Sequence, residues 1–149
     1  MKISPLQLRR YFVSESSCTA NMDFDPGKQS ELSFDQFHVE TDLWQTEGKS
    51  GAWTLKMVIT NQIGPQQNFP YEFKLVLHGF MVCTGTVPHG LEEARYVKIN
   101  GFSILYGIAR EIVRATTARG PWRDVMIPTV SFFEAARLPE KPATNQSQT

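Results

Sequence analysis

The chain has 149 residues, of which 41% are hydrophobic and 20% are charged. This composition is ordinary for a globular protein, and the length suits a single domain that buries about 70% of its unfolded surface. Fifteen basic residues balance fifteen acidic residues, so no excess of positive charge points to nucleic acid or to an anionic membrane surface. We expect one domain over residues 1–138, followed by a polar tail at 139–149, and no binding to nucleic acid.

Neither the apolar runs nor the cysteines indicate an exported or membrane-bound protein. No apolar run approaches the roughly 18 residues that a membrane-spanning helix needs. The N-terminal segment lacks the long apolar core and the cleavage site of a secretory signal. Cys18 and Cys83 are the two cysteines, and neither has a metal-binding or redox spacing. We therefore expect a cytoplasmic protein with reduced thiols and no membrane insertion, although the sequence alone does not exclude a disulfide.

The alternation of apolar and polar residues predicts four β-strands in the first half of the chain. We expect them at residues 7–20, 34–45, 52–63 and 69–84. Turn-rich stretches separate them, such as Asp25-Pro26-Gly27 after the first strand. Gly79 interrupts the fourth strand, which predicts either a bulge or a close approach of another part of the chain.

The second half of the chain predicts mainly helix. From residue 98 to 119, pairs of apolar residues recur every four positions and form a wide apolar stripe. Gly120 and Pro121 then form a stop signal, in which Gly120 can adopt the left-handed conformation. Shorter helices are expected within 87–98 and 133–138. Strands followed by helices indicate an α+β fold: a four-stranded antiparallel sheet with one long and one or two short helices packed on one face.

The sequence contains no pattern that indicates catalysis or a bound cofactor. The three histidines fall on two predicted strands and a loop without recurring spacing, whereas zinc ligands cluster. The adjacent acids Asp23 and Asp25, and Glu92 and Glu93, are typical of solvated turns rather than of an acid–base pair. We expect no enzyme, no metal and no cofactor.

Apolar residues lie on both faces of the predicted sheet. On the second strand, for example, Trp44 points away from Phe37 and Val39. A small sheet with helices on one face needs only one apolar face. The excess is therefore covered by another subunit, forms a groove for an apolar partner, or is buried by loops and the N-terminal segment.

Several short motifs keep a fixed order along the chain. They are LQLRRYFVSESS at 6–17, His78-Gly79-Phe80, SILYGIAREIV at 103–113, ARGPW at 118–122 and IPTVSF at 127–132. Over residues 6–136, these motifs resemble the SecB family of bacterial export chaperones. The resemblance implies a SecB-like sheet and helix, pairing into a dimer or tetramer, and long apolar grooves that hold unfolded or precursor polypeptides without ATP.

The resemblance implies a non-enzymatic holdase, and we expect two sets of residues to serve this function. We expect the client-binding groove to be lined or bordered by Phe34, Phe37, Val39, Tyr71, Phe73, Trp122 and Phe132. We expect the interior or the self-association interface to use Ile104, Leu105, Ile108, Ile112 and Val113.

Some features depart from the family. Its members are generally acidic and use an acidic sheet surface and tail to engage the export motor SecA. This chain is neutral, and its tail PEKPATNQSQT has one glutamate and one lysine, which argues against docking to SecA. A dedicated SecB-like chaperone of one partner, such as the antitoxin of a toxin–antitoxin pair, is therefore an alternative. Two further alternatives are a module that binds a small apolar ligand and a structural subunit.

Overall fold

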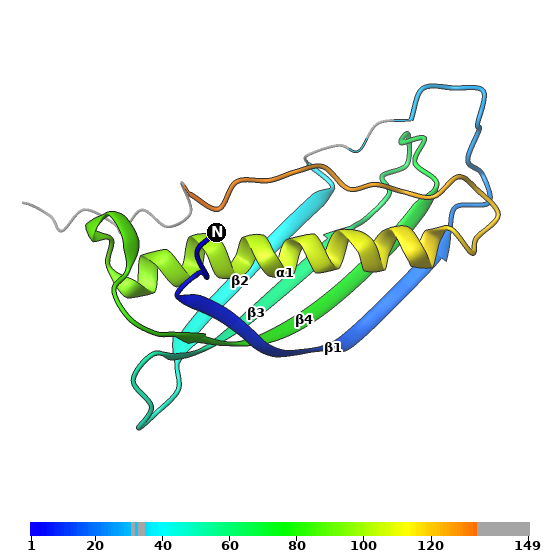
Figure 1. Cartoon of the computed structure of the whole chain (residues 1–149). Coiled ribbons are helices and arrows are strands. Elements are labelled where there is room, and N and C mark those ends of the chain that lie inside the picture. The colour runs from blue at the N-terminus through cyan, green and yellow to red at the C-terminus, as the bar shows by residue number, and fades with distance from the viewer. Residues whose placement is uncertain (31, 33–34, 134–149) are drawn as a thin grey trace, which may run out of the picture.

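The computed structural model describes residues 1–30, 32 and 35–133. Their elements, in chain order, are β1 (Leu6–Ala20), β2 (Phe37–Gln45), β3 (Ala52–Asn61), β4 (Tyr71–Cys83), the short 3-10 helix η1 (Pro88–Gly90) and α1 (Glu93–Thr117). Figure 1 shows α1 lying across one face of the sheet. The predicted α+β fold is confirmed. Within the described residues, no helix is both long enough and apolar enough to cross a membrane.

The order of strands in the sheet is β1-β4-β3-β2, and all neighbours are antiparallel. The first two strands therefore lie at opposite edges although they are consecutive in the sequence. The connection between them begins with the 21–30 loop, which lies at one end of the sheet. This loop lies beside the residues that lead into β4, where the Asn21 amide donates to the Pro70 carbonyl at 2.8 Å.

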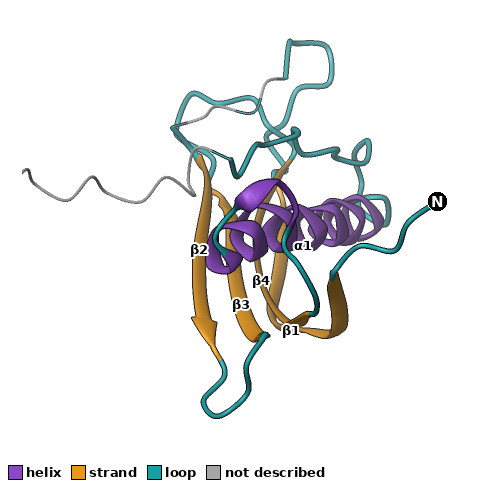
Figure 2. Ribbon diagram, turned by 60° about the vertical axis from the view of Figure 1, so that its left-hand side comes forward, coloured by secondary structure: helices purple, strands orange, loops and turns teal. Residues whose placement is uncertain are grey.

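The two faces of the sheet differ as the period-two pattern predicts. On the face toward α1, Leu55, Met57 and Ile59 of β3 are completely buried. On the opposite face, Trp44 of β2 is 46% exposed. Figure 2 shows that the helix covers one side of the strands and that no described element covers the other.

Two glycines allow the helix to lie close to the sheet. A Cβ atom on Gly79 would lie 2.8 Å from Cδ2 of Leu105, and one on Gly101 would lie 2.6 Å from Cδ2 of Leu55. The close approach predicted at Gly79 is confirmed. The predicted bulge is not found there, because the irregularities of the β1–β4 pair lie in β1, between Leu8 and Arg10 and between Val13 and Glu15.

The helix differs from its predicted bounds at both ends. It starts at Glu93, so much of the short helix expected within 87–98 is the first part of α1. It ends at Thr117, followed by Ala118 in a right-handed conformation. Gly120 is not among the glycines with positive φ, so the predicted left-handed cap is wrong. Gly120 is instead needed for space, since a Cβ there would lie 2.7 Å from Cε1 of Tyr71.

Residues 121–133 run back along α1 in an extended conformation without forming a strand (Figure 1). Side chains of the helix hold this segment: Tyr106 donates its hydroxyl proton to the Pro128 carbonyl, and Arg110 Nε donates to the Ile127 carbonyl at 3.1 Å. The ring of Phe132 packs against Tyr106, with ring centroids 5.8 Å apart. The helix predicted at 133–138 lies almost wholly outside the described residues.

The burial of Tyr106 makes its contribution to stability dependent on pH. Burial raises the pKa of its phenol to about 12, and nearby Arg110 opposes this shift only partly. Below pH 10 the phenol is protonated in both states. Between pH 10 and 12 the unfolded chain releases the proton while the folded chain keeps it, so stability falls as the pH rises through this window.

We therefore expect the free energy of unfolding to fall between pH 10 and 12 by more in the wild type than in Tyr106→Phe. The difference between the two proteins should be on the order of 1–3 kcal/mol. Urea unfolding of both proteins at several pH values checks this difference, because other groups titrating there contribute equally to both. If the free energy of unfolding fell equally with pH in both proteins, the phenol would titrate alike in the folded and unfolded states.

Candidate functional site

A cavity of about 550 Å³ with both polar and apolar walls opens where α1 ends and β4 begins. We call it the terminal groove. Its lining residues come from the 21–30 loop, from the start of β4 and from the turn after α1: Phe24, Pro26, Lys28, Ser30, Phe69, Pro70, Pro121, Trp122, Arg123, Asp124, Val125 and Met126. The volume falls within the range of about 300–1,000 Å³ that is typical of ligand pockets.

Asn21 joins the three segments that form the terminal groove. Its side-chain amide donates to the Phe69 carbonyl at 3.0 Å, ahead of β4. Its own backbone carbonyl accepts a hydrogen bond from the indole of Trp122 at 2.9 Å. Residues 69 and 122 are thus both tied to the end of β1, and the groove does not depend on a ligand to bring its walls together.

Tyr71 fixes the turn after α1 from behind the groove. Its hydroxyl accepts a hydrogen bond from the Trp122 backbone amide at 3.0 Å and lies 3.2 Å from the Thr117 carbonyl, to which it can donate. The hydroxyl of Thr117 in turn accepts from the Val125 amide at 2.9 Å. Tyr71 and Thr117 are buried, and buried hydrogen bonds of this kind are costly to lose.

The inner surface of the groove presents an aromatic pair. Phe24 and Trp122 meet edge to face, with ring centroids 5.4 Å apart. The loop carrying Phe24 is held by a reciprocal pair of hydrogen bonds, in which Asn68 accepts from the Asp25 amide and donates to the Asp25 carbonyl, each at 2.8 Å. This arrangement offers an apolar partner a preformed aromatic surface that demands no fixed hydrogen-bond geometry.

A second, shallower apolar depression of about 540 Å³ lies between β1 and α1. We call it the lateral groove. Its lining residues are Tyr11, Ile104, Gly107, Ile108, Glu111, Ile112 and Ala115. Tyr11 is 46% exposed and Ile104 is 39% exposed, so apolar side chains of both β1 and α1 face solvent at this groove.

The structure distributes the predicted client-binding residues over different environments. Trp122 lines the terminal groove, and Tyr71 supports its wall through the hydroxyl. Phe37, Phe73 and Phe132 are buried in the core of the single chain. Val39 is half-buried on the inner face of β2, and Phe34 lies outside the described residues.

The predicted interior or interface residues divide in the same way. Leu105 and Val113 are buried beneath the helix. Ile104, Ile108 and Ile112 line the lateral groove. The apolar stripe therefore has one side that is buried and one side that lines the lateral groove.

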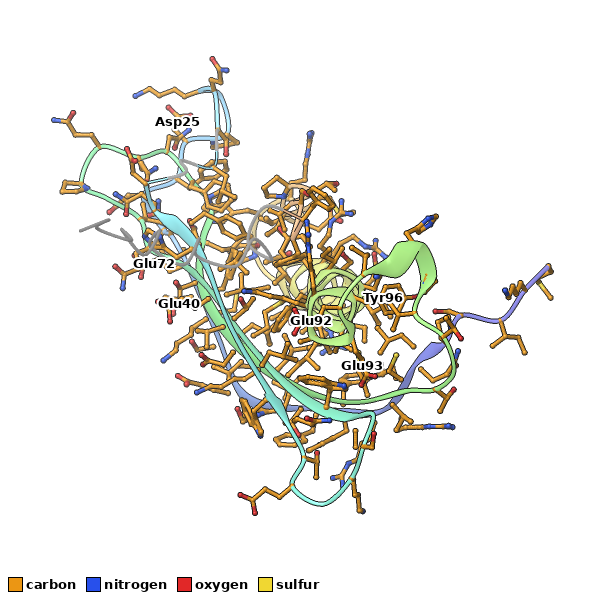
Figure 3. The ribbon with its side chains drawn as sticks, turned by 90° about the vertical axis from the view of Figure 1, so that its left-hand side faces the viewer. Asp25, Glu40, Glu72, Glu92, Glu93 and Tyr96 are labelled. Atoms are coloured by element: carbon orange, nitrogen blue, oxygen red, sulfur yellow. The ribbon has the colours of Figure 1, made fainter. Side chains whose placement is uncertain are left out.

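The side chains that could support catalysis or metal binding do not lie close together. In the described part of the chain, no group of three His, Cys, Asp or Glu residues is arranged to hold a metal ion. Figure 3 shows Asp25 in its loop, far from Glu92 and Glu93 at the start of α1. Glu93 accepts a hydrogen bond from the Trp53 indole at 2.8 Å, which gives this acid a structural role.

The two cysteines are free, so a disulfide between them is not formed. Cys18 pairs with Phe73 near one end of the sheet, whereas Cys83 pairs with Leu6 at the other end. Burial raises the pKa of both thiols, and the charge of nearby Glu93 adds to this effect at Cys83. Higher thiol pKa values mean less thiolate, so neither cysteine is activated as a nucleophile.

A long helix laid across one face of a four-stranded antiparallel sheet, with strand order β1-β4-β3-β2, defines this chain as an α+β protein with a SecB-like fold. It is similar to the SecB-like chaperone Rv1957 of Mycobacterium tuberculosis, solved in complex with a ChAD peptide from the HigA1 antitoxin. The TM-score is 0.64 at 15% identity, over 85% of this chain and 91% of that one. The predicted SecB-like fold is thus confirmed.

A protein of unknown function from Streptococcus agalactiae is also similar in structure. Its TM-score is 0.52 at 13% identity, over 83% of this chain and 97% of that one. No protein-family model and no curated protein matches the sequence. At such identities the likeness establishes the fold alone.

The sequence-based expectations missed several groove residues. Phe24 and Met126 line the groove from loops, and Asn21 joins its walls. Phe24 stands between two aspartates in a polar turn, and a single apolar residue in such a turn is too common to signal a site. No local signal identifies Asn21, because its hydrogen-bond partners are distant in the sequence. Phe69 is 48 positions away and Trp122 is 101 positions away.

Proposed function

We propose that this protein is a chaperone-like holdase that binds non-native polypeptides in the terminal groove, without nucleotide. The observation that carries this proposal is a preformed aromatic groove on a SecB-like fold. The related chaperone of M. tuberculosis was solved with a bound peptide, which supports a polypeptide as the ligand of this fold. Affinity would come from burial of apolar client side chains, at about 25 cal/mol per Å² before ordering costs are subtracted.

Within this proposal the predicted client-binding residues take different parts. Trp122 contacts the client directly, together with Phe24 and Met126 from the same groove. Tyr71 acts through the turn that it holds. Phe37, Phe73 and Phe132 support the surface from the core, and Val39 is the member of the set that remains half-buried on β2.

We also propose that the lateral groove is a self-association surface. It combines exposed Tyr11 of β1 with the isoleucines of α1 that line it, and exposed Val13 lies two residues further along β1. A stable interface buries about 800 Å² on each partner, and a second copy of the lateral groove offers apolar surface of matching character. Pairing through it leaves the terminal groove, at the end of the helix, open to a client.

A dedicated chaperone of one partner is the second candidate function, and the outer face of the sheet favours it over general export. That face carries charges of both signs. Lys74 pairs with Glu15 there at 3.2 Å, and Lys56 lies opposite Asp42 in the β2–β3 register. Glu40 and Glu72 lie on the same side, away from the helix (Figure 3). The M. tuberculosis chaperone, whose bound peptide comes from an antitoxin, supports an antitoxin as the kind of partner.

The test measures the mass of the protein in solution and then its effect on a chemically denatured model protein that aggregates on dilution. We expect a dimer or tetramer that suppresses light scattering at about one assembly per client and needs no ATP. A module for a small apolar ligand would instead bind such a compound and leave aggregation unchanged. A monomer with no effect on aggregation would contradict the holdase proposal.

A further inference from the structure

The charged residues at the rim of the terminal groove differ in whether they already have a partner of opposite charge. Three of its lining residues are charged: Lys28, Arg123 and Asp124. The Asp124 carboxylate lies 3.9 Å from a guanidinium nitrogen of Arg114, so its charge is already partly offset from outside the groove. Lys28 lies 3.9 Å from Asp25, in a pair that is well exposed on both sides.

Arg123 is the rim charge without such a partner. It is exposed, and none of the ion pairs within the described residues involves it. It lines the same groove as Phe24 and Trp122. A ligand seated on these two rings therefore meets an apolar floor and an available cation at the edge.

We infer that the terminal groove selects polypeptide segments in which an apolar or aromatic anchor is flanked by acidic residues. This inference rests on the proposed function and specifies its substrate. An extended client advances about 3.3–3.6 Å per residue, so a carboxylate one or two residues from the anchor comes within reach of the long Arg123 side chain. The planar guanidinium can hold such a carboxylate through two hydrogen bonds.

The preference is modest in size and sensitive to salt. Exposed ion pairs change affinity by about two- to five-fold each. Screening acts over roughly 10 Å at 0.1 M salt. We therefore expect acidic flanks to raise the affinity about two- to five-fold over neutral flanks at low ionic strength, with the difference lost at 0.5 M salt.

The experiment uses three fluorescently labelled peptides of equal length, each with a central Trp-Leu anchor flanked by glutamate, serine or lysine. Anisotropy titrations give their dissociation constants for the wild type and for Arg123→Glu. Lys49→Glu is the matched control, because it makes the same change of charge in the hairpin between β2 and β3, away from the groove (Figure 1).

The expected order of affinity is glutamate, serine, lysine for the wild type and for Lys49→Glu. In Arg123→Glu the order reverses. Equal binding of the three peptides, or an order that Arg123→Glu leaves unchanged, overturns the selectivity while leaving the holdase proposal intact. Failure of all three peptides to bind the wild type overturns both.

Discussion

Replacing Gly120 with alanine is expected to lower the free energy of unfolding by about 3–5 kcal/mol, although the change adds one methyl group. The new Cβ would lie 2.7 Å from Cε1 and 2.8 Å from Cζ of Tyr71. The Tyr71 ring is buried and cannot rotate away without leaving its partners. Its movement would leave the Trp122 amide unpaired, so the strain of overpacking and a lost hydrogen bond add together.

Urea unfolding of Gly120→Ala is best compared with that of Gly107→Ala. Gly107 lies in the middle of α1, and a Cβ built there would have no atom within 4 Å apart from its chain neighbours and the backbone of its own helix. The same chemical change at this position should raise stability by up to about 1 kcal/mol, because alanine is the better helix former. If the two variants were equally stable, the contact between Gly120 and Tyr71 would not limit the packing of the turn.

Replacing Trp122 with alanine is expected to weaken the binding of an apolar peptide about 30-fold, equivalent to about 2 kcal/mol, and to abolish the suppression of aggregation. The indole supplies one half of the aromatic pair in the terminal groove, and its N–H ties the groove to Asn21. Loss of the ring therefore removes contact area and releases one wall. Binding constants from peptide titrations and light-scattering assays measure the two effects.

Trp44→Ala is the matched control for this variant. Trp44 is the tryptophan on the outer face of β2, where it is 46% exposed. Its removal deletes the same side chain from a surface that the proposal does not use. Trp122→Phe keeps an aromatic ring but lacks the indole N–H, so it should retain much of the binding. Equal losses in Trp44→Ala and Trp122→Ala would place the client on another surface.

The sequence predicted those features that depend on neighbouring residues. Period-two alternation located the four strands and correctly placed Trp44 on the face opposite Phe37. The apolar stripe located α1 and identified both Leu105 beneath the helix and Ile104 beside it. Gly79 indicated a close approach because only a residue without a side chain fits there.

The candidate site was predicted less completely. Trp122 was identified, and it does line the terminal groove, but Phe37, Phe73 and Phe132 proved to be buried. An apolar residue that alternates correctly on a strand has the same pattern whether the surface above it is open or covered. Phe132 is not on a strand: it belongs to residues 121–133, whose position is set by hydrogen bonds from Tyr106 and Arg110.

The amino-acid sequence by itself determined the kinds of elements, their approximate bounds and which residues share a face, because a pattern within one strand or helix depends on local geometry. The tertiary structure decided which strands pair and which loops meet. It also decided the role of Gly120, which leaves space for the ring of Tyr71. The pairing of β1 with β4 brings Asn21, Phe69 and Trp122 together from distant parts of the chain. Such contacts arise only after the chain has closed long loops and packed its core, and no local pattern records them.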